Sequence, residues 1–153
     1  MRRVGRDVPA ALETFLSSFD DDVAEIVHAL RDRVLGVMPN AHEFVWDATN
    51  AVSLVYTPTR RWQDGICHVA TYSRHANLGF NDGAALPDPL RLLEGSGTRI
   101  RHVSFCSVDE VSSAPWVAGY LRAALTNAGV DADVGDGGTT VRESAGPKRR
   151  PRP

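Results

Sequence analysis

Residues 42–57 read HEFVWDATNAVSLVYT, and this stretch decides the fold class. Two runs rich in β-branched and aromatic residues, 42–46 and 51–57, flank the polar tetrapeptide 47–50. That pattern predicts two antiparallel strands joined by a tight turn. Along 51–57 neither set of alternating side chains is strongly polar, so we expect a sheet that is apolar on both faces. Such a sheet must be covered twice, pair with a second copy or cup around a ligand.

Three further strands are expected downstream, because short runs rich in strand-forming residues and bounded by Gly, Asn, Asp or Pro occur at 66–73, 78–80 and 98–105. Helical periodicity lies around this block, and we expect helices at 12–19, 22–38, 88–93 and 114–128. Strands grouped between helices predict an α+β fold. We expect two layers: an antiparallel five-stranded sheet with the helices on one face.

The second helix carries one apolar stripe, formed by Val23, Ile26, Val27, Leu30, Val34 and Val37. Four polar residues fall outside the stripe and are expected in solvent: Glu25, His28, Arg31 and Asp32. Pro39 should end this helix. Ser113 and Gly129 should cap the start and the end of the last helix.

The chain has 153 residues, enough for one domain with a sizeable core and no disulfide or metal staple. We place that domain at 10–129, after a flexible N-terminus at 1–9 and before a weakly ordered, Gly/Pro-rich basic tail at 130–153. Residues 134–141 have some strand-like composition, but three glycines in that run argue against a strand.

Seventeen basic residues against nineteen acidic ones give a net charge of −2. Without the four basic residues at 148–152, thirteen face nineteen, a charge near −6, so we do not expect a nucleic-acid partner. No run approaches the roughly 20 apolar residues that cross a membrane, and the N-terminus lacks the apolar run of a signal peptide. Cys67 and Cys106 lie in apolar runs and have neither disulfide nor metal spacing, so we expect buried free thiols and a cytoplasmic location.

Motifs for catalysis and for metal binding are missing from the sequence. The five histidines lack the i, i+4 spacing of a zinc site, and neither a nucleophile elbow nor a phosphate-binding glycine motif occurs. We therefore assign no catalytic residue, metal ligand or cofactor from these patterns.

One candidate site is the run Gly95-Ser-Gly97, followed by Arg99, Arg101 and His102. Glycines let backbone N–H groups converge on an anion, arginines clamp carboxylate or phosphate, and histidine adds a titrating donor. Alternation along a strand places Arg99 and Arg101 on the side opposite to His102, so they cannot all aim at one point. The alternative is an ordinary turn before an edge strand whose arginines pair with Asp or Glu.

A second candidate site is aromatic and polar, with Trp46, Asp47 and Asn50 near one turn and Tyr72 and His75 near another. Trp and Tyr line small-molecule pockets and protein interfaces alike. The alternative is that Asp47 and Asn50 simply build their turn.

Several segments resemble the YdhG-like family of domains of unknown function: EFVWDATNA at 43–51, VYTPT at 55–59, HVATYSRHANLGF at 68–80, LPDPLRLLEGSG at 86–97 and RIRHV at 99–103. The resemblance implies a two-layer α+β domain with an antiparallel sheet, similar to secretion-chaperone-like folds, and no established catalytic residues. Some relatives look like frataxin-type iron chaperones that hold iron with acidic side chains, a feature that Asp20, Asp21 and Asp22 imitate. The run Gly97-Thr98-Arg99 departs from the family pattern by lacking a lysine.

Together these observations predict a non-enzymatic binding module for a small ligand or a protein. The open sheet face would bind it, with Trp46, Tyr72, His75 and Arg101 near a pocket, and a second copy could form a homodimer there. One alternative is a frataxin-like iron-handling protein that binds iron at Asp20, Asp21 and Asp22. A weaker alternative is an enzyme that uses His75 or His102 as a base.

Overall fold

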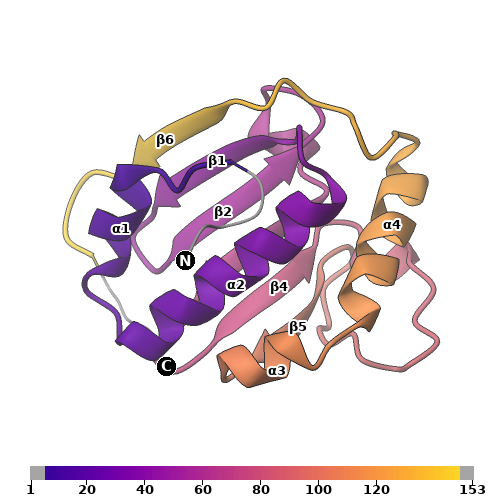
Figure 1. Cartoon of the computed structure of the whole chain (residues 1–153), viewed down its shortest axis with the longest axis horizontal. Coiled ribbons are helices and arrows are strands. Elements are labelled where there is room, and N and C mark those ends of the chain that lie inside the picture. The colour runs from indigo at the N-terminus through magenta and orange to yellow at the C-terminus, as the bar shows by residue number, and fades with distance from the viewer. Residues whose placement is uncertain (1–5, 149–153) are drawn as a thin grey trace.

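Within the described part of the chain, six strands form one open sheet in the order β5-β4-β3-β2-β1-β6 (Figure 1). The computed structural model describes residues 6–148. The strands are β1 (His42–Asp47), β2 (Val52–Thr57), β3 (Cys67–Thr71), β4 (Ala76–Phe80), β5 (Arg101–Phe105) and β6 (Thr139–Glu143). Strands β1 to β5 pair in antiparallel fashion, and β6 lies parallel to β1. The predicted α+β class with a mainly antiparallel sheet is confirmed.

The prediction of five strands was wrong, because β6 adds a sixth at the edge of β1. The glycines that argued against this strand lie before it, in the connection from the last helix. Gly135 has a φ of +114°, and a Cβ atom there would collide with the carbonyl of Asn40. Glycine is therefore needed where the connection passes the start of β1. The outer ends of the predicted N-terminal and C-terminal segments, 1–5 and 149–153, lie outside the described residues.

The α-helices between residues 6 and 148 lie on one face of the sheet: α1 (Ala10–Leu16), α2 (Asp21–Val37), α3 (Val108–Ser112) and α4 (Trp116–Ala128) (Figure 1). Two 3-10 turns, η1 (Trp62–Asp64) and η2 (Gly83–Ala85), lie in the connections between strands. Helix α2 ends before Pro39, and Gly129 ends α4 in the left-handed conformation with a φ of +72°, as predicted. None of the helices in residues 6–148 has the length and apolar content needed to cross a bilayer.

Two local predictions failed. No helix forms at 88–93, where Asp88 instead closes a turn by accepting the backbone N–H groups of Leu92 and Leu93. Ser113 does not begin α4, because the short helix α3 precedes it and takes Ser107 as its N-cap, which accepts the N–H of Glu110 at 3.1 Å.

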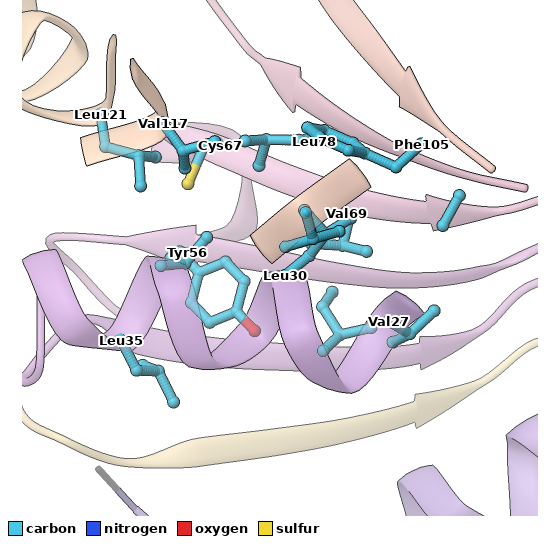
Figure 2. Packing of buried hydrophobic residues seen from close by; sticks show 14 of the residues in the cluster. Val27, Leu30, Leu35, Tyr56, Cys67, Val69, Leu78, Phe105, Val117 and Leu121 are labelled. Atoms are coloured by element: carbon cyan, nitrogen blue, oxygen red, sulfur yellow. The ribbon is translucent and has the colours of Figure 1, made fainter. Parts of the chain in front are cut away.

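The core lies between the helices and the sheet (Figure 2). Leu30 of α2 and Val117 of α4 pack there with strand residues that alternate along the chain, among them Leu54, Val69 and Leu78. The intervening strand residues point to the opposite face, which no α-helix in residues 6–148 covers. The domain therefore has two layers and one helix-free sheet face.

Two of the α2 residues expected in solvent, His28 and Arg31, are buried. Arg31 faces β1, where its Nε lies 2.8 Å from Oε2 of Glu43, and both side chains are fully buried. The hydroxyl of Tyr56 donates to the same oxygen at 2.8 Å. Arg31 also donates to the carbonyl of Asp7, so the N-terminal segment completes its hydrogen bonding. A polar helix position is thus buried by partners that lie on other elements.

Candidate functional site

The predicted site residues fall at opposite ends of the sheet. The antiparallel register places the β1–β2 turn (48–51) and the β3–β4 turn (72–75) at one end. The β2–β3 and β4–β5 connections, 58–66 and 81–100, therefore lie at the other. The two candidate clusters consequently do not form one site.

At the turn end, the candidate residues mainly build structure. Asn50 is exposed in its turn, and Asp47 is buried on the helix side of β1. Tyr72 and His75 stack face to face across the β3–β4 turn, with ring centroids 4.4 Å apart. The Tyr72 N–H also donates to the carbonyl of His75 at 2.9 Å. This end carries a tight hairpin with a stacked ring pair.

At the connection end, the two candidate arginines are engaged by the chain itself. Nε of Arg99 lies 2.7 Å from the carboxylate of Asp82. Arg101 donates to the carbonyls of Gly97 and Ile100 at 2.6 and 2.8 Å, so it closes the loop that precedes β5. The Arg99–Asp82 contact is of the kind that the alternative interpretation expects, in which the arginines pair with Asp or Glu, whereas Arg101 contacts backbone carbonyls.

The remaining residues of that motif do not converge on an anion. His102 pairs through its backbone with Glu94, and its Nε2 lies 3.7 Å from that carboxylate. Gly95 has a φ of +133° and approaches the carbonyl of Ile100, which explains the glycine there. Gly97 offers its carbonyl to Arg101.

Two adjoining hollows open at this end of the sheet, and they share Gln63 and Arg99. The larger, of about 550 Å³, is lined by Trp62, Gln63, Asn81, Gly97, Thr98, Arg99 and Ile100. The smaller, of about 440 Å³, continues toward the end of α4, and its polar side chains are Thr59, Gln63, Asp64, Asp82, Arg99 and Asn127. Both volumes lie in the range of small-molecule sites.

The larger hollow has two exposed apolar walls. Trp62 is 38% exposed and Ile100 is 51% exposed, although both are large apolar side chains. Trp62 leans onto the helix-free face, where its ring meets Trp46 edge-on at 5.8 Å. Apolar side chains held open at a hollow mark a place where a ligand gains by burying them.

The polar rim of the larger hollow is held in place by the residues behind it. Asn81 Oδ1 lies 2.8 Å from Nδ1 of His68. Burial lowers the pKa of His68 below its usual value, although the hydrogen bond to Asn81 opposes this shift, so the ring is neutral at pH 7 and donates Nδ1–H to Asn81. The amide of Asn81 is therefore oriented before any ligand arrives.

Sequence reasoning missed Trp62, Gln63, Asn81 and Ile100. The usable signal was a tryptophan inside the polar loop Arg60-Arg-Trp-Gln-Asp-Gly65, where no core position calls for one. A large apolar side chain in a polar loop either covers a neighbour or faces a ligand, and Trp62 does the first with Trp46 while lining the hollow.

The alternative chemistries find little support in the described residues. Neither hollow is lined by His75 or His102. Asp20, Asp21 and Asp22 are exposed at the start of α2, where the helix dipole already favours acidic side chains. Within residues 6–148 no group of three or more His, Cys, Asp or Glu side chains is arranged to hold a metal ion.

Comparison of the chain with protein-family models, with curated proteins and with solved structures gives no match.

Proposed function

We propose that this chain is a cytoplasmic small-ligand-binding domain whose site is the larger hollow beside Trp62. The observation that carries the proposal is the pair of exposed apolar walls, Trp62 and Ile100, beside the oriented amide of Asn81. A site with apolar walls and a few fixed polar groups has the composition of a ligand pocket.

The ligand class follows from the lining. An indole wall favours a planar ring, because aromatic faces stack at low entropic cost. Asn81, Gln63 and Thr98 offer both donors and acceptors, so the ring should carry a hydrogen-bonding edge. Arg99 is already paired with Asp82, so we do not expect the ligand to be a strongly charged anion.

A binding role fits this lining better than catalysis does. The two carboxylates of the smaller hollow are engaged: Asp64 accepts from Thr59, and Asp82 accepts from Arg99. The hollows offer no histidine or cysteine among their lining residues in 6–148. The larger hollow, which is the proposed site, also has no carboxylate among the residues in 6–148 that line it, so a nucleophile with an adjacent base is not assembled there.

The sequence segments quoted above support a second part of the proposal, that the chain is related to the YdhG-like family. The helix-free face has one competing use, the formation of a homodimer by two copies of the chain. Sedimentation of the full chain separates the two, since a dimer through that face would double the mass and cover Trp62.

The test uses indole, adenine, nicotinamide and benzoate as probes, with saturation-transfer NMR on the full chain. At least one ring should bind, and Trp62→Ala should abolish its binding. Leu90→Ala is the matched control, because Leu90 is also an exposed apolar side chain but lies outside both hollows. Equal binding to the wild type and to Trp62→Ala would overturn the proposal.

A further inference from the structure

Four rings line up on the helix-free face and form what we call the aromatic strip: His42, Phe44, Trp46 and Trp62. His42 meets Phe44 edge-on with centroids 5.0 Å apart, and Trp46 meets Trp62 edge-on at 5.8 Å. Phe44 is only 1% exposed, although no α-helix in residues 6–148 covers this face. Another group must therefore cover the strip.

Arg142 of β6 provides much of that cover. The parallel register places it beside Trp46. Its guanidinium carbon lies 5.3 Å from the centroid of the Phe44 ring and 5.9 Å from that of Trp46. Both distances are those of a cation above aromatic faces.

In the described residues, the guanidinium of Arg142 contacts aromatic rings and no carboxylate. Among residues 6–148, no salt bridge or side-chain hydrogen bond joins Arg142 to a carboxylate. The indole beneath it is held in place, because Trp46 Nε1 donates to Oγ of Ser144 at 3.0 Å. The aromatic strip is thus a preformed binding site for a planar cation.

Arg142, which occupies this binding site, belongs to β6, the most exposed strand of the sheet. Arg142 itself is exposed, as are Val141 and Glu143 on either side. Its side chain can therefore swing into water without opening the core. An exposed side chain that occupies a preformed binding site competes for that site with any external group of the same chemistry.

We propose that the aromatic strip is a binding site for the guanidinium group of an external ligand, and that Arg142 occupies it as an internal competitor in the free chain. Guanidinium is the group that this binding site already holds, and it stacks on aromatic faces more readily than a hydrated ammonium does. This proposal does not rest on the planar-ring site, since Trp62 alone is shared between the strip and the larger hollow.

The test compares the wild type with Arg142→Ala, using ethylguanidinium as the probe and the neutral N-ethylurea as its isostere. Tryptophan fluorescence reports binding. Removing the competitor should tighten ethylguanidinium binding about two- to fivefold, the scale of one exposed cation–π contact, and N-ethylurea should not bind. Arg122→Ala, which removes an exposed arginine of α4, should behave as the wild type.

A second measurement keeps the proposal testable if Arg142→Ala fails to fold. In the wild type, the ring currents of Phe44 and Trp46 shift the NMR signals of the Arg142 side chain. Ethylguanidinium should return those signals toward their free-arginine positions. Equal affinity in wild type and Arg142→Ala, equal binding of N-ethylurea, or Arg142 signals that ignore ethylguanidinium would each overturn the proposal.

Discussion

Arg31 of α2 and Glu43 of β1 form an ion pair in which both side chains are fully buried, with Nε 2.8 Å from Oε2. Burial lowers the pKa of Arg31, but the hydrogen bond to Glu43 and its charge outweigh burial, so the net pKa is raised and the guanidinium stays charged. Tyr56 and Thr139 also reach the Glu43 carboxylate. The pair therefore ties α2, the first two strands and β6 together.

Removing one partner of this pair should destabilise the fold strongly. Arg31→Met leaves the Glu43 carboxylate buried without its counter-charge, which costs about 3–5 kcal/mol of unfolding free energy. Urea denaturation measures the loss, and Arg122→Met on the exposed face of α4 is the control. A loss below about 1 kcal/mol, the scale of a surface pair, would show that the carboxylate finds other compensation.

The hydroxyl of Tyr56 makes stability depend on alkaline pH. Burial, followed by the nearby charge of Glu43, raises the pKa of Tyr56 well above its usual value. The unfolded chain releases this proton near pH 10 while the folded chain keeps it, so the contribution is full below that pH and is lost above it. Denaturation at pH 8 and pH 11 should show a smaller drop in Tyr56→Phe than in the wild type. Equal drops in the two proteins would contradict this assignment.

The two thiols should differ sharply in reactivity. Cys67 is fully buried, and burial raises its pKa, so little thiolate forms. Cys106 is exposed. Iodoacetamide followed by mass spectrometry should label one site in the native chain and two in urea, and native labelling of Cys67 would show that the core opens at this point.

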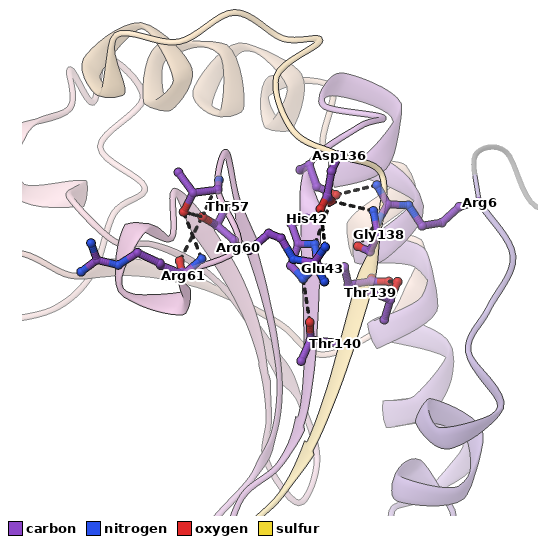
Figure 3. A network of polar contacts seen from close by, with 12 residues as sticks. Arg6, His42, Glu43, Thr57, Arg60, Arg61, Asp136, Gly138, Thr139 and Thr140 are labelled. Carbon is purple, nitrogen blue, oxygen red and sulfur yellow. Dashed lines mark hydrogen bonds and ion pairs between the residues drawn. The ribbon is translucent and has the colours of Figure 1, made fainter.

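Strand β6 should depend on His42. The ring lies 2.8 Å from Asp136 through Nδ1 and 2.8 Å from Thr140 through Nε2; Thr140 belongs to β6, and Asp136 lies in the connection that leads to it (Figure 3). His42→Ala removes both hydrogen bonds, each worth about 1 kcal/mol, so amide exchange over 139–143 should accelerate roughly tenfold or more. Exchange in β3 and β4 is the internal control. Equal acceleration in every strand would indicate a global loss of stability.

The elements that the sequence predicted well depend on local patterns. The apolar stripe of α2, the proline after it and the glycine after α4 act within a few residues, and the structure has those helix ends where they were expected. The strands β1 and β2 followed from composition and from the polar tetrapeptide between them.

The features that were missed depend on contacts between distant residues. Arg31 is buried only because Glu43 and Tyr56 meet it from the sheet. Strand β6 forms because it pairs with the edge of β1. The glycine-rich sequence that precedes β6 gives no sign of this pairing. The hollow beside Trp62 is lined by residues of the β2–β3 and β4–β5 connections. The periodicity of the sequence does not predict the paths of these connections in space.

Chemical-shift mapping tests whether a planar ring binds between Trp62 and Ile100. The ¹⁵N-labelled full chain would be titrated with whichever of indole, adenine, nicotinamide and benzoate binds most tightly. We expect shifts concentrated on Trp62, Gln63, Asn81 and 97–100. Shifts concentrated instead on the apolar groove of Trp116, Gly119 and Tyr120, or none with any of the four rings, would contradict it.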